Sequence, residues 1–239
     1  MASLTAAYTT MDVIGDLVAL VRHEGATRAM IVGTDWGANI AWQAAQMRPD
    51  VFRAIAALGV PMMGRAPMLP SQLFPKTESA VFYTHYFNQP GVAEQEFERD
   101  VGATLRKIYF CASGAMGPRD GGTPNPFGMV PRGGGLLDSL TDPTALPPWL
   151  GAADLERFVQ AYTRSGFRGG LNYYRASPLY PPTDGDPGAK AMQWKPADFR
   201  VRVPTLVIWG EADTALPVTL LDGLTELVDD LTVHRLPRA

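Results

Sequence analysis

Gly33-Thr34-Asp35-Trp36-Gly37-Ala38 lies between a short apolar run and a helical pattern, and it decides the fold. The apolar run, residues 29–32, is typical of a strand covered on both faces, and residues 38–47 form a helix pattern of small and apolar side chains. Small residues two positions before Asp35, and two and three positions after it, permit a turn in which larger side chains would collide. The stretch predicts a strand, a tight turn and a helix.

Strand and helix patterns alternate on both sides of this turn. Thr10 or Asp12 can cap a helix over residues 11–24. Further along the chain we expect strands over 54–58, 203–209 and 231–236 and a helix over 216–228. Because alternating strands and helices are typical of a parallel sheet, the predicted fold class is α/β with a mostly parallel sheet.

The pattern changes between residues 61 and 196, where helices and loops replace core strands. A helix that opens at Pro90-Gly91 carries one apolar face, and a later helix carries another. The two faces are Phe97, Val101, Leu105 and Ile108, and Leu155, Phe158, Val159 and Tyr162. We expect an inserted helical cap over 61–196 and a core formed by 1–60 and 197–239, with the cap over the strand ends where such sheets bind ligands.

Composition narrows the function classes. The 239-residue chain has a net charge of −3 and scattered Lys and Arg residues, so we expect no nucleic-acid partner. Cys111 is the only cysteine, which excludes an internal disulfide and a Cys-rich metal site. No stretch approaches the roughly 20 apolar residues of a spanning helix. We expect a cytoplasmic protein with no cofactor, no metal and no membrane partner.

Asp35, the central residue of the turn, can act as a nucleophile. The turn projects its side chain beside the N-terminus of the next helix, where N–H groups and the helix dipole stabilise an anion. An ionised carboxylate can attack an electrophilic alkyl carbon without a base to remove a proton. The alternative is an Asp that caps a helix in an ordinary turn, and the hexapeptide alone does not decide between the two.

Further segments after the turn extend the pattern. They are Ala41-Trp42, Arg48-Pro49, Phe52-Arg53-Ala54 and Gly59-Val60-Pro61. Together with residues 33–38 they resemble the nucleophile region of epoxide hydrolases of the α/β-hydrolase fold. Thr34 stands where the family usually has His, at a position that supports the turn. The resemblance implies a partial α/β-hydrolase fold in which Asp35 is the nucleophile and the Trp36 N–H belongs to the oxyanion hole.

Two segments of the middle region carry tyrosines. Residues 81–94, VFYTHYFNQPGVAE, and 165–175, SGFRGGLNYYR, are similar to the two tyrosine motifs of the epoxide hydrolase cap. The ring-opening tyrosines then fall on Tyr83 and Tyr174, whereas Tyr86 and Tyr173 fall on packing positions. Two phenols would stabilise the alkoxide as the ring opens, and one can supply a proton. Without the family, packing is the better interpretation of these tyrosines.

The loop after the strand over 203–209 carries Gly210-Glu211-Ala212-Asp213. The resemblance implies that Asp213 is the charge-relay acid, which accepts an N–H from the catalytic His and fixes its tautomer. Without the family, Asp213 would be a helix N-cap. Glu211 lies too close to the strand end to match the family pattern and is interpreted as a surface residue.

None of the three histidines is a convincing base. His23 lies in the last turn of the first helix, His85 belongs to the cap, and His234 lies inside a strand pattern, whereas the family's His follows that strand. The family's His-Gly-x-Pro oxyanion loop is also not found before Asp35. We therefore expect a chain that is truncated at both ends of the catalytic domain and hydrolyses poorly.

The resemblance implies hydrolysis of an epoxide to a vicinal diol through an alkyl ester of Asp35, with a small-molecule epoxide and water as partners. A haloalkane dehalogenase would use the same ester chemistry, but a departing halide does not need the proton that Tyr83 or Tyr174 can supply. A non-catalytic remnant or binding module would share every motif. Because only four core strands are found, residues 29–32 should form an exposed edge that permits self-association.

Overall fold

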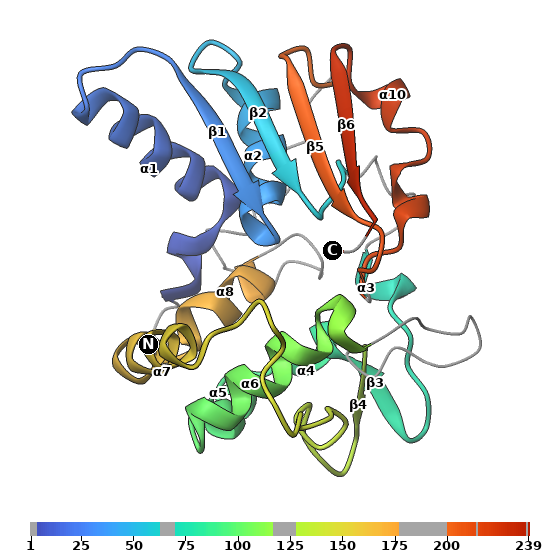
Figure 1. Cartoon of the computed structure of the whole chain (residues 1–239). Coiled ribbons are helices and arrows are strands. Elements are labelled where there is room, and N and C mark those ends of the chain that lie inside the picture. The colour runs from blue at the N-terminus through green and yellow to red at the C-terminus, as the bar shows by residue number, and fades with distance from the viewer. Residues whose placement is uncertain (1–3, 63–69, 117–127, 177–199, 214, 238) are drawn as a thin grey trace. The chain divides into compact units, whose positions relative to one another are not determined.

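The computed structural model describes residues 4–62, 70–116, 128–176, 200–213, 215–237 and 239. It divides into two compact units (Figure 1). Unit 1 comprises Met1–Leu69, Ala176–Glu211 and Leu216–Ala239, and unit 2 comprises Pro70–Arg175 and Ala212–Ala215. Within the described ranges, no helix has both the length and the apolar character that crossing a bilayer requires.

Unit 1 is built on a sheet of four parallel strands in the part of the chain that the structure describes. They are β1 (Ala29–Thr34), β2 (Phe52–Leu58), β5 (Thr205–Gly210) and β6 (Leu231–Leu236), in the order β1-β2-β5-β6. The register pairs Gly33 with Ala57, and Ala57 with Val207. The predicted parallel sheet is confirmed, including the strand after the chain returns from the middle region.

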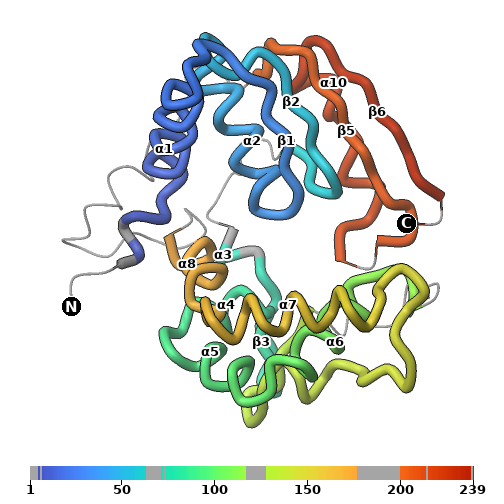
Figure 2. The backbone as a smooth tube through the Cα atoms, turned by 60° about the vertical axis from the view of Figure 1, so that its left-hand side comes forward, coloured from blue at the N-terminus to red at the C-terminus, as the bar shows by residue number. Residues whose placement is uncertain are grey.

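Two helices flank β1 in the sequence (Figure 2): α1 (Thr10–His23), which follows a short 3-10 helix η1 (Leu4–Tyr8), and α2 (Trp36–Met47). The predicted cap of α1 was wrong, because Thr9 is the N-cap. The Thr9 hydroxyl oxygen accepts a hydrogen bond from the Asp12 N–H at 3.2 Å, which satisfies one of the donors at the helix start.

The predicted continuous helix over 216–228 is also wrong. The structure has a 3-10 helix η3 (Val218–Leu221) and a short helix α10 (Leu224–Leu227). Gly223 lies between them with a φ of 77° and is the N-cap of α10. A residue in the left-handed conformation cannot continue a right-handed helix, so the apolar pattern is divided into two short turns.

The core of unit 1 joins the sheet to α2. Its buried members include Ala38 and Trp42 from α2, and Ile55, Val207 and Trp209 from the strands. Trp42 also donates its ring N–H to the Val60 carbonyl at 3.0 Å. This packing fixes the start of α2 against the ends of β1 and β2, which is the place of the predicted tight turn.

The composition of β1 predicts a strand that is covered on both faces, but the structure covers only one face. Ile31 packs against the core of unit 1, whereas Met30 and Val32, which alternate with it, are 66% and 69% exposed. Among the described strands β1 is at the edge of the sheet, as expected. One face of this edge strand is therefore apolar and exposed.

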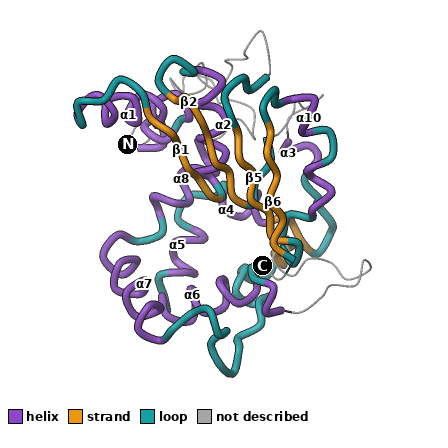
Figure 3. Tube along the Cα trace, turned by 45° about the horizontal axis from the view of Figure 1, so that its top comes forward, coloured by secondary structure: helices purple, strands orange, loops and turns teal. Residues whose placement is uncertain are grey.

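Unit 2 is mainly helical (Figure 3). Its helices are α3 (Pro70–Leu73), α4 (Tyr83–Phe87), α5 (Val92–Phe97), α6 (Val101–Cys111), η2 (Gly114–Met116), α7 (Ala152–Ser165) and α8 (Arg168–Ala176). Strands β3 (Ala80–Phe82) and β4 (Met129–Pro131) form a small antiparallel sheet, apart from the parallel one.

The apolar face predicted after Pro90-Gly91 belongs to two helices, α5 and α6. Asp100 interrupts it, because its side chain accepts a hydrogen bond from the Ala103 N–H at 2.9 Å and caps α6. Phe97 and Leu105, on either side of the break, are both buried in the core of unit 2. The face was predicted correctly, but the helix was not.

Candidate active site

Asp35 occupies a strained position between β1 and α2. Its φ is 51° and its ψ is −126°, and it is the only residue other than glycine with a positive φ in the described ranges. A Cβ atom at Gly33 would lie 2.1 Å from the Gly37 carbonyl oxygen, so the backbone on the two sides of Asp35 approaches as closely as glycine permits. Strain of this kind is concentrated at functional sites.

The Asp35 carboxylate lies at the N-terminus of α2. Its Oδ2 accepts a hydrogen bond from the Trp36 N–H at 2.6 Å, and the side chain is exposed. An ordinary N-cap has an extended backbone and accepts from the second or third helical N–H, whereas Asp35 has a positive φ and accepts from the first. The geometry therefore differs from that of the simple helix cap that the sequence left open.

Trp36 and Thr34 complete the turn. The Trp36 N–H and the positive end of the α2 dipole both act on the same carboxylate oxygen, which favours negative charge there. The Thr34 hydroxyl donates to the Leu58 carbonyl at 3.4 Å and so links the turn to β2. Thr34 thus supports the turn without contributing a reactive group.

Tyr83 and Tyr174 come together within unit 2. Tyr83 begins α4 and Tyr174 lies in α8, and their rings are 5.9 Å apart between centroids at an interplanar angle of 82°. Phe87 contacts both, with centroids at 5.3 Å from Tyr83 and 4.9 Å from Tyr174. Two segments that are distant in sequence therefore place their phenols on one aromatic cluster.

A buried ion pair that the sequence analysis did not find ties the same helices together. Arg175, next to Tyr174, donates to both carboxylate oxygens of Glu94 at 2.6 and 2.8 Å. It also donates to the carbonyls of Phe87 and Gln89, at 3.0 and 3.1 Å, so it links α8 to the end of α4. The sequence did carry one signal, since a Glu three residues after the N-cap Gly91 can accept a hydrogen bond from the Gly91 N–H, as the Glu of a capping box does.

Glu94 is held as a carboxylate. Burial by itself would raise the pKa of Glu94, but the hydrogen bonds from Arg175 and from backbone N–H groups outweigh that effect and lower the pKa below its usual value. The Gly91 N–H, at 3.0 Å, is one of these donors. The ion pair is therefore fully charged near neutral pH, and its side chains are only 7% and 12% exposed.

Tyr86 is a packing residue of this unit, as expected. It is 7% exposed and donates its hydroxyl to Glu96 Oε2 at 2.9 Å. Burial, followed by the hydrogen bond to Glu96, raises the pKa of Tyr86 far above its ordinary value. Its phenol is therefore committed to a structural contact.

Asp213 lies in the loop after β5. Its Oδ1 accepts a hydrogen bond from the Ala215 N–H at 2.7 Å, and the N-cap of the next helical turn is Pro217. The alternative interpretation of Asp213 as a helix N-cap is therefore wrong. Glu211, by contrast, is paired at 3.7 Å with Arg235 of β6, in keeping with a surface residue.

The three histidines lie where the sequence placed them. His23 ends α1, His85 belongs to α4, and His234 lies inside β6, paired in register with Ile208. His234 is therefore level with Ile208, which precedes Asp213 by five residues in the sequence. Burial lowers the pKa of His85, and Lys76 adds to this effect. No group of three or more His, Cys, Asp or Glu side chains in the described ranges could hold a metal ion.

Comparison with known proteins defines the family. Residues 2–239 match the model of the alpha/beta hydrolase fold. The chain is 34% identical over 223 residues to Epoxide hydrolase A of Mycobacterium tuberculosis (strain ATCC 25618 / H37Rv), covering 93% of this chain and 65% of that protein. It is also 34% identical over 207 residues to Epoxide hydrolase 1 of Siraitia grosvenorii, covering 86% and 59%. The chain thus spans less than two thirds of the length of these curated relatives.

Solved structures give the same result. The crystal structure of Epoxide Hydrolase A from Mycobacterium thermoresistibile matches 100% of this chain and 71% of its own, with a TM-score of 0.82 and 30% identity. An epoxide hydrolase from an endophytic Streptomyces matches 98% and 69%, with a TM-score of 0.80 and 31% identity. The relatives and solved structures that the chain resembles are named epoxide hydrolases, and the chain belongs to the α/β-hydrolase fold family.

Proposed function

We propose that the Asp35 carboxylate opens an epoxide and that the resulting ester is hydrolysed to a vicinal diol. The observation that carries this proposal is the strained turn of residues 33–38, here called the elbow, in which Asp35 has a φ of 51° and its Oδ2 lies 2.6 Å from the Trp36 N. Fixing one carboxylate oxygen orients the other for attack. The names of the relatives, which are epoxide hydrolases, support the substrate class.

The first step forms the ester. One oxygen of Asp35 attacks a ring carbon, the C–O bond breaks, and its electron pair moves to the epoxide oxygen. One phenol of the pair Tyr83 and Tyr174 transfers its proton to that oxygen while the other donates a hydrogen bond. The contact between the two rings supports this assignment, because both donors have to reach a single oxygen atom.

The second step releases the diol. It needs a base, a role that we assign to none of the three histidines of this sequence, so the ester should persist. The base removes a proton from water, which adds to the ester carbonyl, and the Trp36 N–H stabilises the oxyanion. The acyl C–O bond then breaks, and the protonated base returns its proton to the departing alkoxide. The proton that remains on Asp35 restores the phenol. We assign Asp213 the role of orienting the base.

The experiment is a single-turnover incubation with a reactive aryl epoxide, followed by intact-protein mass measurement. The chain should gain the mass of one epoxide, and Asp35→Asn should prevent this gain. Tyr83→Phe and Tyr174→Phe should each slow it, by about two orders of magnitude if one donor is lost. Labelling that persists in Asp35→Asn would refute the proposal.

A dehalogenase is the less favoured function, and the same chain tests it. A bromoalkane should release no bromide, whereas release that is independent of Tyr83 and Tyr174 would favour dehalogenation. A chain that takes up neither reagent would be a binding module.

We also propose a cytoplasmic location, supported by the single thiol, Cys111, which is buried and reduced.

A further inference from the structure

We propose that unit 2 has a second binding site, a cavity that takes a small organic carboxylate. The cavity has a volume of about 460 Å³ and is formed by α4, the segment before β3 and the end of β4. Its described lining includes Lys76, His85 and Arg132, but neither Tyr83 nor Tyr174. It is therefore a site apart from the phenols assigned to ring opening.

The positive charge of the cavity is held in place by the backbone. Lys76 forms an antiparallel bridge with Val81, which fixes the start of its side chain at the cavity wall. Arg132 donates its backbone N–H to the Ser79 carbonyl at 2.9 Å and its Nε–H to the Thr77 carbonyl at 3.0 Å. A guanidinium held through Nε keeps its remaining N–H donors for a ligand.

The structure gives these cations no carboxylate among the described residues. Its ion pairs join other side chains, and neither Lys76 nor Arg132 takes part in them. His85 adds a ring but little charge, because burial and then Lys76 lower its pKa, with Arg132 acting in the same direction. Near neutral pH the cavity therefore carries the two charges of Lys76 and Arg132.

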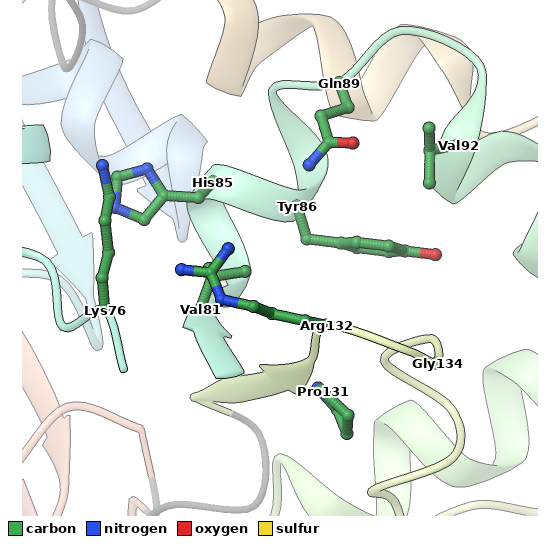
Figure 4. Close-up of a pocket in the computed structure, with 9 residues that line it drawn as sticks. All are labelled: Lys76, Val81, His85, Tyr86, Gln89, Val92, Pro131, Arg132 and Gly134. Carbon is green, nitrogen blue, oxygen red and sulfur yellow. The ribbon is translucent and has the colours of Figure 1, made fainter. Parts of the chain in front are cut away.

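The cationic groups are gathered on one side of the cavity. Figure 4 shows the Lys76 amine, the Arg132 guanidinium and His85 on that side, with Val92 and the Tyr86 hydroxyl on the other. Two carboxylates lie near that second side, because the Tyr86 hydroxyl donates to Glu96 and the Asp138 carboxylate lies beside Gly134, which also lines the cavity.

The oxygens of Glu96 are occupied by other donors, and its partner, the Tyr86 hydroxyl, is on the side of the cavity away from Lys76 and Arg132. Its oxygens accept hydrogen bonds from the Leu136 and Leu137 N–H groups, at 3.1 and 2.9 Å, in addition to Tyr86. The apolar part of the lining is Val81, Val92 and Pro131, and Gln89 adds a neutral polar side chain. The cavity thus has a cationic side, and the rest of its lining is mixed apolar and polar.

This distribution of charge selects the class of ligand. A cavity of this volume is in the range of small-molecule sites and larger than an inorganic anion needs. A planar guanidinium binds a carboxylate through two parallel hydrogen bonds, and an adjacent ammonium adds a third. The apolar wall then accommodates a short hydrocarbon or aryl body. A carboxylate with such a body satisfies both ends.

The test is titration of the full chain with phenylbutyrate, followed by ¹H–¹⁵N NMR. We expect saturable shifts that are confined to the segments around Lys76, His85 and Arg132, and that weaken as salt is added. The neutral amide, phenylbutyramide, should bind at least about tenfold more weakly, because it lacks the charge-assisted hydrogen bonds. Equal binding of the amide, or saturation by inorganic phosphate alone at the same concentrations, would overturn the assignment.

Variants locate the site independently. Arg132→Met and Lys76→Met should each weaken phenylbutyrate binding about tenfold or more, and the double variant should abolish it. Arg164→Met removes an exposed cation from α7 of the same unit and should leave binding unchanged. The spectra of the free variants report whether they are folded. Binding that is unaffected in the folded double variant would show that the cavity is not the site.

Discussion

Replacing Arg175 by Met should destabilise unit 2 by about 3–5 kcal/mol, the usual cost of breaking a buried ion pair by removing one partner. Arg175 and Glu94 are 7% and 12% exposed in their side chains, and their two hydrogen bonds are 2.6 and 2.8 Å long. The variant leaves the Glu94 carboxylate buried without its counter-charge. It also removes the donors to the Phe87 and Gln89 carbonyls.

The destabilisation should depend on pH in a defined direction. In the unmodified protein the pKa of folded Glu94 is lowered, so its contribution to stability is present above the unfolded value of about 4.3 and is lost as the pH falls through the folded pKa. In Arg175→Met, burial is no longer opposed by Arg175, so the pKa of folded Glu94 rises. Its carboxyl then becomes neutral on mild acidification. The loss of stability should be larger at pH 7 than at pH 4.

Thermal unfolding followed by near-ultraviolet circular dichroism measures this loss, because the aromatic cluster of unit 2 contributes the signal. At about 4 °C per kcal/mol for a unit of roughly a hundred residues, the midpoint should fall by about 12–20 °C. Glu94→Gln/Arg175→Met should recover part of the loss, since no charge remains buried.

The matched control is Arg157→Met. Arg157 pairs with Asp154 at 2.9 Å, but both side chains are exposed, so the expected loss is below about 1 kcal/mol. A loss of that size in Arg175→Met, or a loss that is equal at pH 4 and pH 7, would refute the reasoning on the buried pair.

Three further predictions concern unit 1 and the loop after β5. Gly33→Ala should lower the free energy of unfolding by about 3 kcal/mol in urea, because a Cβ has no room there; Gly15→Ala, in a helix with open space, should not lower it. Asp213→Asn should leave single-turnover labelling intact, since its assigned role begins after the ester forms, and lost labelling would contradict that role. Met30 and Val32 are exposed on an uncharged edge strand, so the chain should pair with a second copy through β1. Light scattering should then rise with protein concentration, and it should fall in the Met30→Lys/Val32→Lys variant. A monomer at every concentration would exclude this pairing.

The elbow could be predicted from sequence because its causes are local. Gly33 is required because its backbone closely approaches that of Gly37, four residues further on, and the apolar run before it had only to be recognised as a strand. The same locality explains why the strands over 203–209 and 231–236 were found. The first contains the continuous apolar run of residues 206–209, and the second begins by alternating apolar and polar residues, Leu231-Thr232-Val233-His234.

Two predicted helices were wrong because a single residue divides each of them inside a continuous apolar pattern. Asp100 caps a new helix inside a face that runs from Phe97 to Leu105, and Gly223 takes a left-handed conformation inside another. Periodicity reports which side chains face the core, and both faces were right in that sense. It does not report where the backbone hydrogen bonds end, which depends on capping groups that also occur within helices.

The edge position of β1 was predicted, but the exposure of one of its faces and the Arg175–Glu94 pair could not have been, for two different reasons. Composition shows that Met30 and Val32 suit a covered face, but only the order of the strands and the packing of α2 show that this face is exposed. The ion pair joins residues 81 positions apart, and nothing in the sequence near Arg175 indicates its partner.

The two parts of the candidate site therefore depend on different kinds of interaction. The carboxylate of Asp35 is oriented by its own turn, since the closest backbone contact and the Trp36 hydrogen bond both lie within residues 33–38. The phenols of Tyr83 and Tyr174 meet only because α4 and α8 are joined by Phe87 and by the buried pair of Arg175 and Glu94. A substitution that loosens unit 2 should thus displace the proton donors while the elbow keeps its geometry. Attack by Asp35 and proton transfer to the epoxide oxygen then depend on separate parts of the chain, so such a substitution should slow labelling by an epoxide without changing the geometry at Asp35.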